Sequence, residues 1–426
     1  MNYRLILFFI GILNLGANGQ TKDFDDFLAI ARENSPLIFR KQTQNKAMEA
    51  ELKRIKAFYT RPQISLDAGL LFAPIISTDN NTTKFEFVSP GAHDYYGYDL
   101  NASDGGQYQA FVSVEQPVFG GNRVEIASGN LAVSREINET EIKMTAHELE
   151  RIVGLQYLRC LRSQKRIDAF SQLTGLVEKE LQLMGQLTQS GVYKYSDYEL
   201  LNIEYQNYQV SLEQSKASYQ QDFLDLNIIC GINDTNTVKL KEHGFGLNKP
   251  PEESFFLKKY KLDSLKLNSL RQMSEIKYQP QLSLFANGGL NAIYLPDYNR
   301  IGIGFGLKFS WTLFDGHQRD FNRERTNILT REFSFQKQRF ITENSVRKTK
   351  ILNQIKSIGK QISIKSAQGN SYDKLIRIYK TEFSQGELSA IEFVSVLRDK
   401  VNLNLKLIDL KMQKQALINT YNFWNY

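Results

Sequence analysis

The sequence has few of the residues from which catalytic and metal sites are built. Its 426 residues include only two cysteines and four histidines. Cys160 and Cys230 stand far apart without a metal-ligand spacing, so we expect two buried small apolar groups in preference to a disulfide. No nucleophile or acid–base group accompanies the isolated histidines. The sequence therefore predicts no enzyme, no cofactor and no metal site.

Proline is missing from two long stretches. None occurs between Pro117 and Pro250, and none follows Pro296. Ala, Leu, Glu, Gln, Lys and Ile dominate both stretches, and these residues favour helix. The composition therefore predicts very long helices. One helix over about residues 122–187 would measure on the order of 100 Å, at roughly 1.5 Å per residue.

Long apolar runs are missing too. Beyond the N-terminus, no run comes near the roughly eighteen consecutive apolar residues that a membrane-spanning helix needs. Residues 1–19 carry Arg4, an apolar stretch over residues 5–15 and small residues near the end, which is typical of a secretory signal peptide. If the exported chain is embedded in a membrane, we expect it to be so through strands.

A concentrated positive charge is absent as well. The net charge is +7, but the lysines are scattered along the predicted helices among acidic residues. A nucleic-acid-binding protein needs a clustered basic surface. We therefore expect no nucleic-acid partner.

What the sequence does contain is a set of strands with one apolar face. In IGIGFGLKFSWTLFDG, residues 301–316, large apolar residues alternate with small or polar ones from residue 301 to residue 313. The run does not fit the dinucleotide-binding fingerprint, because Leu307 stands where that motif has its last glycine. Three further segments alternate in the same way: QISLDAGLLF, QYQAFVSVEQ and QLSLFANGGL.

The two halves of the chain repeat each other. YTRPQISLDAGL aligns with KYQPQLSLFANG at an offset of 218 residues, and from PVFGGNR and TLFDGHQ onward the offset is 195. The second offset pairs Gly191 with Gly386 and Asp197 with Glu392. The two offsets differ because the first half has extra residues between its paired strands, which predicts a long loop in the first half and a short one in the second. A duplication explains this order most simply.

The repeat predicts the domain organisation. The first repeat covers residues 20–240 with a β-hairpin at about 62–119, the second covers 254–426 with a β-hairpin at about 280–314, and residues 241–253 link them. In each repeat a long helix follows the hairpin and a second helix returns. The returning helices, from Tyr198 and from Phe393, are apolar at seven of nine positions of 3-4 spacing, which predicts coiled-coil packing.

Four strands cannot close a barrel, and lipid does not tolerate an open sheet edge, so strands from several chains must join. Two chains would give eight strands with a filled interior, whereas three would give twelve, the smallest multiple expected to leave a conduit. We expect the apolar face to meet lipid and the other face to line the lumen. The lipid-facing residues are Ile303, Phe305, Leu307, Phe309 and Trp311, and the lumen-facing residues are Asp67, Glu115, Gly302, Gly304, Gly306 and Lys308.

Several motifs occur in a distinctive order: ARENSPLI, RPQISL and YQPQLSL, PVFGG and TLFDG, and SGVYKYSDY and QGELSAIEF. This order resembles the TolC-type outer-membrane efflux family over nearly the whole mature chain. The resemblance implies a mainly α protein with a membrane β-barrel, a homotrimer whose twelve-stranded barrel continues into a twelve-helix periplasmic tunnel. It also implies a passive, gated exit duct of a Gram-negative outer membrane, serving a tripartite efflux pump or a type I secretion system.

The resemblance further implies partners and site residues. The partners are outer-membrane lipid, a periplasmic adaptor and an inner-membrane pump of RND or ABC type. The turns with Gly191, Val192, Gly386 and Glu387 would form the periplasmic tip where the adaptor docks. Asp197 and Glu392 would lie near the closed aperture and hold it, or they would only cap the returning helices. The alternative function is a soluble periplasmic coiled-coil adaptor or scaffold.

Overall fold

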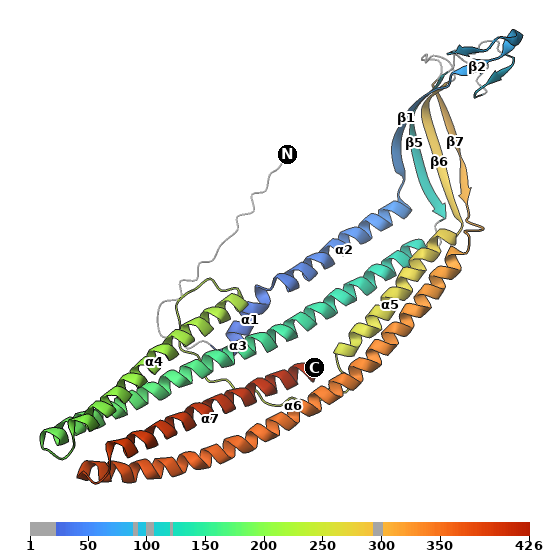
Figure 1. The fold of residues 1–426 in the computed structure, drawn as a ribbon. Coiled ribbons are helices and arrows are strands. Elements are labelled where there is room, and N and C mark those ends of the chain that lie inside the picture. Colours follow the sequence, from blue (N-terminus) through green and yellow to red (C-terminus); the bar gives the residue numbers. More distant parts are fainter. Residues whose placement is uncertain (1–22, 88–92, 99–105, 120–121, 293–300) are drawn as a thin grey trace, which may run out of the picture. The chain divides into compact units, whose positions relative to one another are not determined.

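A computed structural model describes residues 23–87, 93–98, 106–119, 122–292 and 301–426 (Figure 1). The predicted signal peptide, residues 1–19, lies outside the described residues. The helices are α1 (Phe24–Glu33), α2 (Pro36–Thr60), α3 (Arg123–Gln189), α4 (Tyr195–Cys230), α5 (Phe256–Glu275), α6 (Gln318–Gln385) and α7 (Ala390–Trp424). The strands are β1 (Gln63–Phe72), β2 (Ile75–Ser77), β3 (Lys84–Glu86), β4 (Tyr95–Tyr96), β5 (Gly106–Phe119), β6 (Gln281–Ala292) and β7 (Ile301–Ser310).

The very long helices are confirmed. Helix α3 has 67 residues and helix α6 has 68, and neither contains a proline. Since proline removes a backbone donor and clashes with the preceding turn, its absence lets the hydrogen-bond ladder run without a break. No helix in the described parts of the chain is long and apolar enough to cross a membrane.

The chain divides into two compact units. The helical unit comprises the described residues of Met1–Lys41, Glu141–Leu257 and Gln338–Tyr426. The sheet unit comprises the described residues of Gln42–Thr140 and Lys258–Lys337. Each unit contains matching segments from both halves of the sequence, as expected for a duplication.

The sheet unit contains a four-stranded antiparallel sheet in the order β1-β5-β6-β7 (Figure 1). The two predicted hairpins, β1 with β5 and β6 with β7, are confirmed, and β5 joins them by pairing with β6. Strand β7 ends at Ser310, whereas the alternation predicted a strand to residue 313. Ser310 pairs with Gln281, the first residue of β6, and Pro280 before it has no N–H to extend the ladder. Trp311 therefore lies just beyond the strand.

A second, three-stranded sheet, β3-β2-β4, forms within the region that the sequence predicts only as a long loop. The Asp79 carboxylate accepts hydrogen bonds from the backbone N–H groups of His93 at 3.0 Å and Asp94 at 2.7 Å. Asn80 and Asn81 have φ values of 56° and 58°, a left-handed turn that asparagine tolerates. Strands of two or three residues are too short for an alternation pattern to reveal.

The helical unit has a core in which α3, α4, α6 and α7 meet, and these helices lie side by side (Figure 1). The buried side chains of this core include Phe170 and Val177 of α3, Leu201 and Tyr208 of α4, Phe383 of α6, and Phe393, Val394 and Leu397 of α7. All nine predicted 3-4 positions of α4, and all nine of α7, are buried or half-buried. The burial predicted for these positions of the returning helices is therefore confirmed.

Candidate sites on the sheet and at the helical turns

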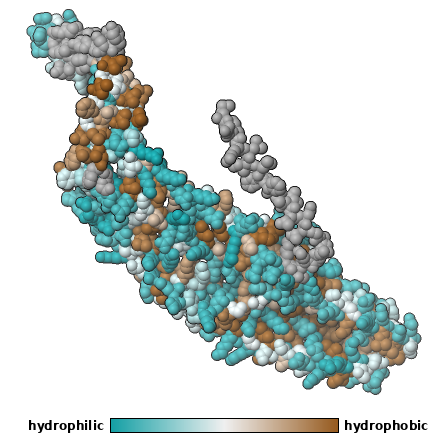
Figure 2. Space-filling view, turned by 180° about the vertical axis from the view of Figure 1, so that it is seen from behind, coloured by the Kyte–Doolittle hydropathy of each residue, from teal (hydrophilic) through white to brown (hydrophobic). Residues whose placement is uncertain are grey.

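One face of the four-stranded sheet is apolar and exposed. This apolar face carries Ile64, Leu66 and Leu70 of β1, Val112 of β5, Leu284 of β6, and Ile301, Ile303, Phe305, Leu307 and Phe309 of β7. Ile303 and Phe305 are each 87% exposed. Figure 2 shows apolar side chains gathered over the sheet. Monomeric soluble proteins rarely expose a contiguous apolar patch of this kind, so the face requires a cover from outside the single chain.

The opposite face, the polar face, carries the predicted lumen residues. The ammonium group of Lys308 on β7 lies 4.0 Å from the carboxylate of Glu115 on β5. The two side chains meet across the intervening strand β6, on which the buried Ser283 pairs with Lys308 and Phe285 pairs with Glu115. Asp67 accepts a 2.9 Å hydrogen bond from the Ser65 hydroxyl. The charged residues of the sheet therefore share one face, opposite the aliphatic side chains of the apolar face and the phenylalanines of β7.

The three alternating glycines of β7 differ in their surroundings. A Cβ at Gly306 would lie 2.8 Å from the ring of Phe285, and one at Gly304 would lie 2.6 Å from the amide oxygen of Asn287. Both glycines therefore make room for the residue opposite them on β6. A Cβ at Gly302 would meet no atom within 4 Å. Packing thus explains the glycine at 304 and at 306, but not at 302.

Two aromatic residues on the polar face were missed at the sequence level. Phe111 and Phe285 stand at positions of the alternation where neighbouring segments have small or polar residues. The strand pairing shows that both rings lie on the polar face, because Phe111 pairs with Asp67 and Phe285 pairs with Gly306. A phenylalanine that pairs with a glycine could have indicated this position, since the ring can lie over the bare backbone of the glycine.

The two predicted turns have the same backbone geometry. Gly191 and Gly386 both have a φ of 77°, the left-handed conformation that ends many helices. After α3, the N–H of Val192 donates to the carbonyl of Leu187 at 2.9 Å; after α6, the N–H of Glu387 donates to that of Glu382 at 2.9 Å. These are Schellman motifs, and they explain why a glycine stands at each turn.

The two turns also contact each other. The Tyr193 hydroxyl lies 3.0 Å from the carbonyl oxygen of Phe383 and 2.7 Å from that of Leu388. The Tyr193 and Phe383 rings stack with centroids 5.2 Å apart. A Cβ at Gly386 would lie 2.5 Å from Cγ1 of Val192, whereas one at Gly191 would meet nothing within 4 Å. The four predicted tip residues therefore lie at the end of one four-helix core.

Asp197 and Glu392 each cap the helix that returns from a turn. The N–H of Lys194 donates to the Asp197 carboxylate at 3.2 Å. The N–H of Ser389 donates to the Glu392 carboxylate at 3.3 Å, and the Glu392 N–H donates back to the Ser389 hydroxyl at 3.3 Å. The capping alternative is therefore present in the structure. A role in holding an aperture stays a prediction.

No family model matches the sequence, and no curated protein matches it. Solved structures, however, match 94% of the chain. The CmeC outer membrane channel of Campylobacter jejuni matches with a TM-score of 0.67 at 11% identity over 85% of its chain. The outer membrane protein VceC of Vibrio cholerae matches with a TM-score of 0.67 at 10% identity over 96% of its chain. CusC matches with a TM-score of 0.70 at 11% identity over 91% of its chain.

The chain has the fold of the TolC-type outer-membrane channels. The TolC-like chain fold that the resemblance implied is thus confirmed, although the sequence identity is very low, whereas the homotrimer and its closed barrel stay predictions.

In this TolC-type fold, ion pairs join the two helical hairpins of the chain. Glu204 of α4, whose side chain is only 6% exposed, lies 2.8 Å from Arg398 of α7. Burial alone would raise the pKa of Glu204, but side-chain hydrogen bonds to its carboxylate, the strongest from Arg398, together with the charge of Arg398 outweigh burial and lower that pKa. Glu180 of α3 lies 2.5 Å from Lys380 of α6. Because Glu204 and Glu180 are buried, each ion pair fixes the position of one helical hairpin along the helix axes of the other.

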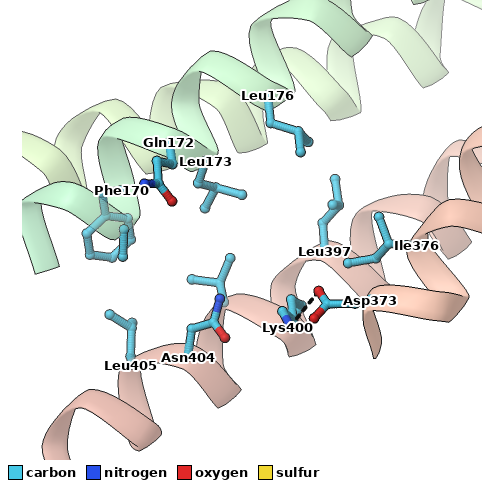
Figure 3. A pocket seen from close by; sticks show the side chains of 12 residues that line it. Phe170, Gln172, Leu173, Leu176, Asp373, Ile376, Leu397, Lys400, Asn404 and Leu405 are labelled. Atoms are coloured by element: carbon cyan, nitrogen blue, oxygen red, sulfur yellow. Dashed lines mark ion pairs between the residues drawn. The ribbon is translucent and has the colours of Figure 1, made fainter. Parts of the chain in front are cut away.

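In the same unit, a cavity of about 310 Å³ lies between α3, α6 and α7, farther from the two glycine turns than the Glu180–Lys380 pair (Figure 3). Apolar side chains such as Phe170, Leu173 and Ile376 line most of it. At its rim Lys400 contacts the Asp373 carboxylate at 2.7 Å and the Gly369 carbonyl at 3.1 Å. Lys400 therefore holds α7 against one turn of α6.

Proposed function

We propose that the protein is a passive outer-membrane exit duct that works as a homotrimer. The observation that carries this proposal is the exposed apolar face of a sheet whose other face holds the charged residues. Lipid is a cover that suits Ile303 and Phe305, and water suits Glu115 and Lys308. Trp311, just beyond β7, would lie at the edge of the lipid layer. The TolC-type fold, shared with named outer membrane channels, supports the same conclusion.

The geometry of the sheet edges supports closure by sister copies. Within the part of the chain that the structure describes, strands β1 and β7 each pair on one side only, and all neighbouring strands of the sheet are antiparallel. With four strands in a copy, β1 and β7 run in opposite directions, so β7 of one copy can pair with β1 of the next. Three copies would give twelve strands, enough to leave a conduit.

A stripe on α6 offers a further contact between copies. Phe321, Ile328 and Phe335 are seven residues apart and are 64%, 58% and 70% exposed. Apolar residues at heptad spacing pack against another helix. A sister copy is the partner that the proposed closed ring would bring there, and α3, α4, α6 and α7 of three copies would supply the twelve-helix tunnel.

The proposed role also needs partners at the turns. Val192, Tyr195 and Ile391 are 48%, 67% and 66% exposed around the two glycine turns. We assign this surface to a periplasmic adaptor, which would connect the duct to an RND or ABC pump. Efflux pump and type I secretion are both served by this arrangement.

Reconstitution in planar lipid bilayers tests the proposal. The purified protein should insert from detergent and give discrete conductance steps, and cysteines at the edges of β1 and β7 should cross-link into trimers. Recovery of the chain as a monomer in a detergent-free periplasmic extract would instead support the soluble scaffold.

A further inference from the structure

The polar face of the sheet contains a cavity of about 340 Å³. Its lining includes Gln109, Phe111, Asn287, Gly289, Asn291 and Gly302, which come from three neighbouring strands. This volume is within the range of small-molecule sites. We call this cavity the Gly302 basin.

The floor of the Gly302 basin lacks a side chain at Gly302, although the packing of the fold does not require a glycine there. Gly289 needs to be glycine, because a Cβ there would lie 2.5 Å from the backbone Cα of Phe111. Gly304 is covered by the Asn287 side chain. Gly302 has neither constraint, since a Cβ would meet nothing within 4 Å and its φ is not positive. Glycine inside a strand costs stability, so an unforced glycine here points to a need for open space.

The walls of the basin have a definite chemistry. Phe111 supplies an aromatic ring, and Gln109, Asn287 and Asn291 supply three side-chain amides. Among the described residues, these amides have no hydrogen-bond partner. An amide can both donate and accept, so the walls suit a planar solute with hydrogen-bonding groups at its rim.

Among the described residues, a carboxylate stands beside the basin. Asp67 is the cross-strand partner of Phe111, and directly opposed side chains lie within about 5.5 Å of each other at Cβ. Lys308, a cation on the same face, lies beside Glu115 at the other end of β7. Among the described residues, a cation in the basin would therefore meet an aromatic ring and a carboxylate, whereas an anion would have no cation in the row of Asp67, Phe111, Gly289 and Gly302.

We propose that the Gly302 basin is a binding site for flat aromatic organic cations on the wall of the duct. The ring of the solute lies on the bare backbone at Gly302 beside Phe111, and its positive charge is directed toward Asp67. This inference rests on the proposed function, in which a sister copy closes the open side of the basin next to β7. The basin then gives the passage a preference for cationic over anionic aromatic solutes.

Fluorescence anisotropy of ethidium with the solubilised full-length protein tests the inference. Gly302→Val fills the basin, and the open space around Gly302 should let the strand accept it. Gly69→Val is the matched control, since Gly69 lies on the same face of β1, outside the basin, and also meets nothing within 4 Å. We expect Gly302→Val to weaken ethidium binding about tenfold or more, and Gly69→Val to leave it within about twofold.

Two further variants keep the result clear if Gly302→Val folds poorly. Phe111→Leu retains an apolar side chain but no ring, and Asp67→Asn removes the charge; each should weaken ethidium binding several-fold. The anionic dye fluorescein should bind much more weakly than ethidium. Equal ethidium binding by wild type, Gly302→Val and Phe111→Leu would overturn the proposal, as would equal binding of the two dyes.

Conductance of the same preparations separates the two claims. If the protein forms channels but Gly302→Val binds ethidium normally, the binding-site proposal is contradicted and the duct proposal is supported. If Gly302→Val alone abolishes ethidium binding and no preparation conducts, the binding-site proposal is supported and the duct proposal is contradicted.

Discussion

At the scale of single residues, the two turn glycines share a backbone conformation but not an environment. Both have a φ of 77°, yet only Gly386 has a neighbour, Val192, where a Cβ would be placed. A left-handed conformation costs a residue with a Cβ about 1 kcal/mol. At Gly386 the collision with Val192 adds to that cost.

We predict that Gly386→Ala lowers the thermal stability of the solubilised protein more than Gly191→Ala does. Circular dichroism at 222 nm during heating measures both variants under one condition. The combination Gly386→Ala with Val192→Ala should recover the difference, because it removes the colliding methyl group. Equal losses in the two single variants would show that the contact between the turns is not formed.

The glycines of β7 show what residue patterns alone could and could not predict. Alternation over residues 301–310 was sufficient to assign Ile303 and Phe305 to an apolar face. It did not distinguish Gly302 from Gly306, because that difference depends on Phe285 of the neighbouring strand. Register is a tertiary property, so a single segment does not contain it.

At the scale of elements, helices α4 and α7 are held together by a buried carboxylate. Glu204 has a lowered pKa in the folded protein, from an ordinary value of 4.5. The group therefore contributes stability that is fully present above its unfolded pKa and is lost as the pH falls through the folded pKa. The relevant window lies below about pH 4.5, and neutral pH has the full contribution.

We predict that Glu204→Gln lowers the stability of the helical unit at pH 7 by about 1–2 kcal/mol, since Arg398 loses its charged partner. The difference from wild type should shrink as the pH falls below 4.5. Glu213→Gln is the control, because its pair with Lys216 on the same helix is exposed, at 70% and 53%. A Glu204→Gln effect that stays constant between pH 7 and pH 3.5 would contradict the ionic contribution.

The capping carboxylates allow a test of the aperture prediction. Asp197→Ala with Glu392→Ala removes both the caps and the charges, and we expect it to raise the conductance of the reconstituted protein. Asp197→Asn with Glu392→Gln keeps an acceptor for the N–H groups of Lys194 and Ser389 but removes the charge. If charge at the aperture matters, the amide pair should also change the conductance. If neither pair differs from wild type, only the capping role is left.

Most elements could be predicted because they are long and periodic. The absence of proline predicted α3 and α6, and the 3-4 spacing predicted the buried side of α4 and α7. The small sheet β3-β2-β4 could not be predicted, since the segment is held by hydrogen bonds from the backbone N–H groups of His93 and Asp94 to the Asp79 carboxylate, fourteen and fifteen residues away. The cross-hairpin pairs such as Glu204 with Arg398 also lie far apart in sequence, and no local pattern marks them.

At the scale of the whole molecule, we propose that the two faces of the four-stranded sheet meet different solvents, water on the polar face and lipid on the apolar face. The proposal rests on the exposed apolar side chains of one face and on the charged pair Glu115–Lys308 of the other. The described strands of one chain leave β1 and β7 unpaired on their outer sides, so the proposal also requires sister copies.

Nitroxide scanning of residues 301–310 in lipid bilayers tests this claim most directly. Each position would be changed to cysteine in a background without Cys160 and Cys230, which are both buried, and labelled with a spin label. Oxygen collects in lipid, whereas a nickel chelate stays in water. We predict that residues 303, 305, 307 and 309 collide mainly with oxygen and that residues 302, 304, 306 and 308 collide mainly with the nickel chelate. Collision with the nickel chelate at every position, without a period of two, would contradict the account.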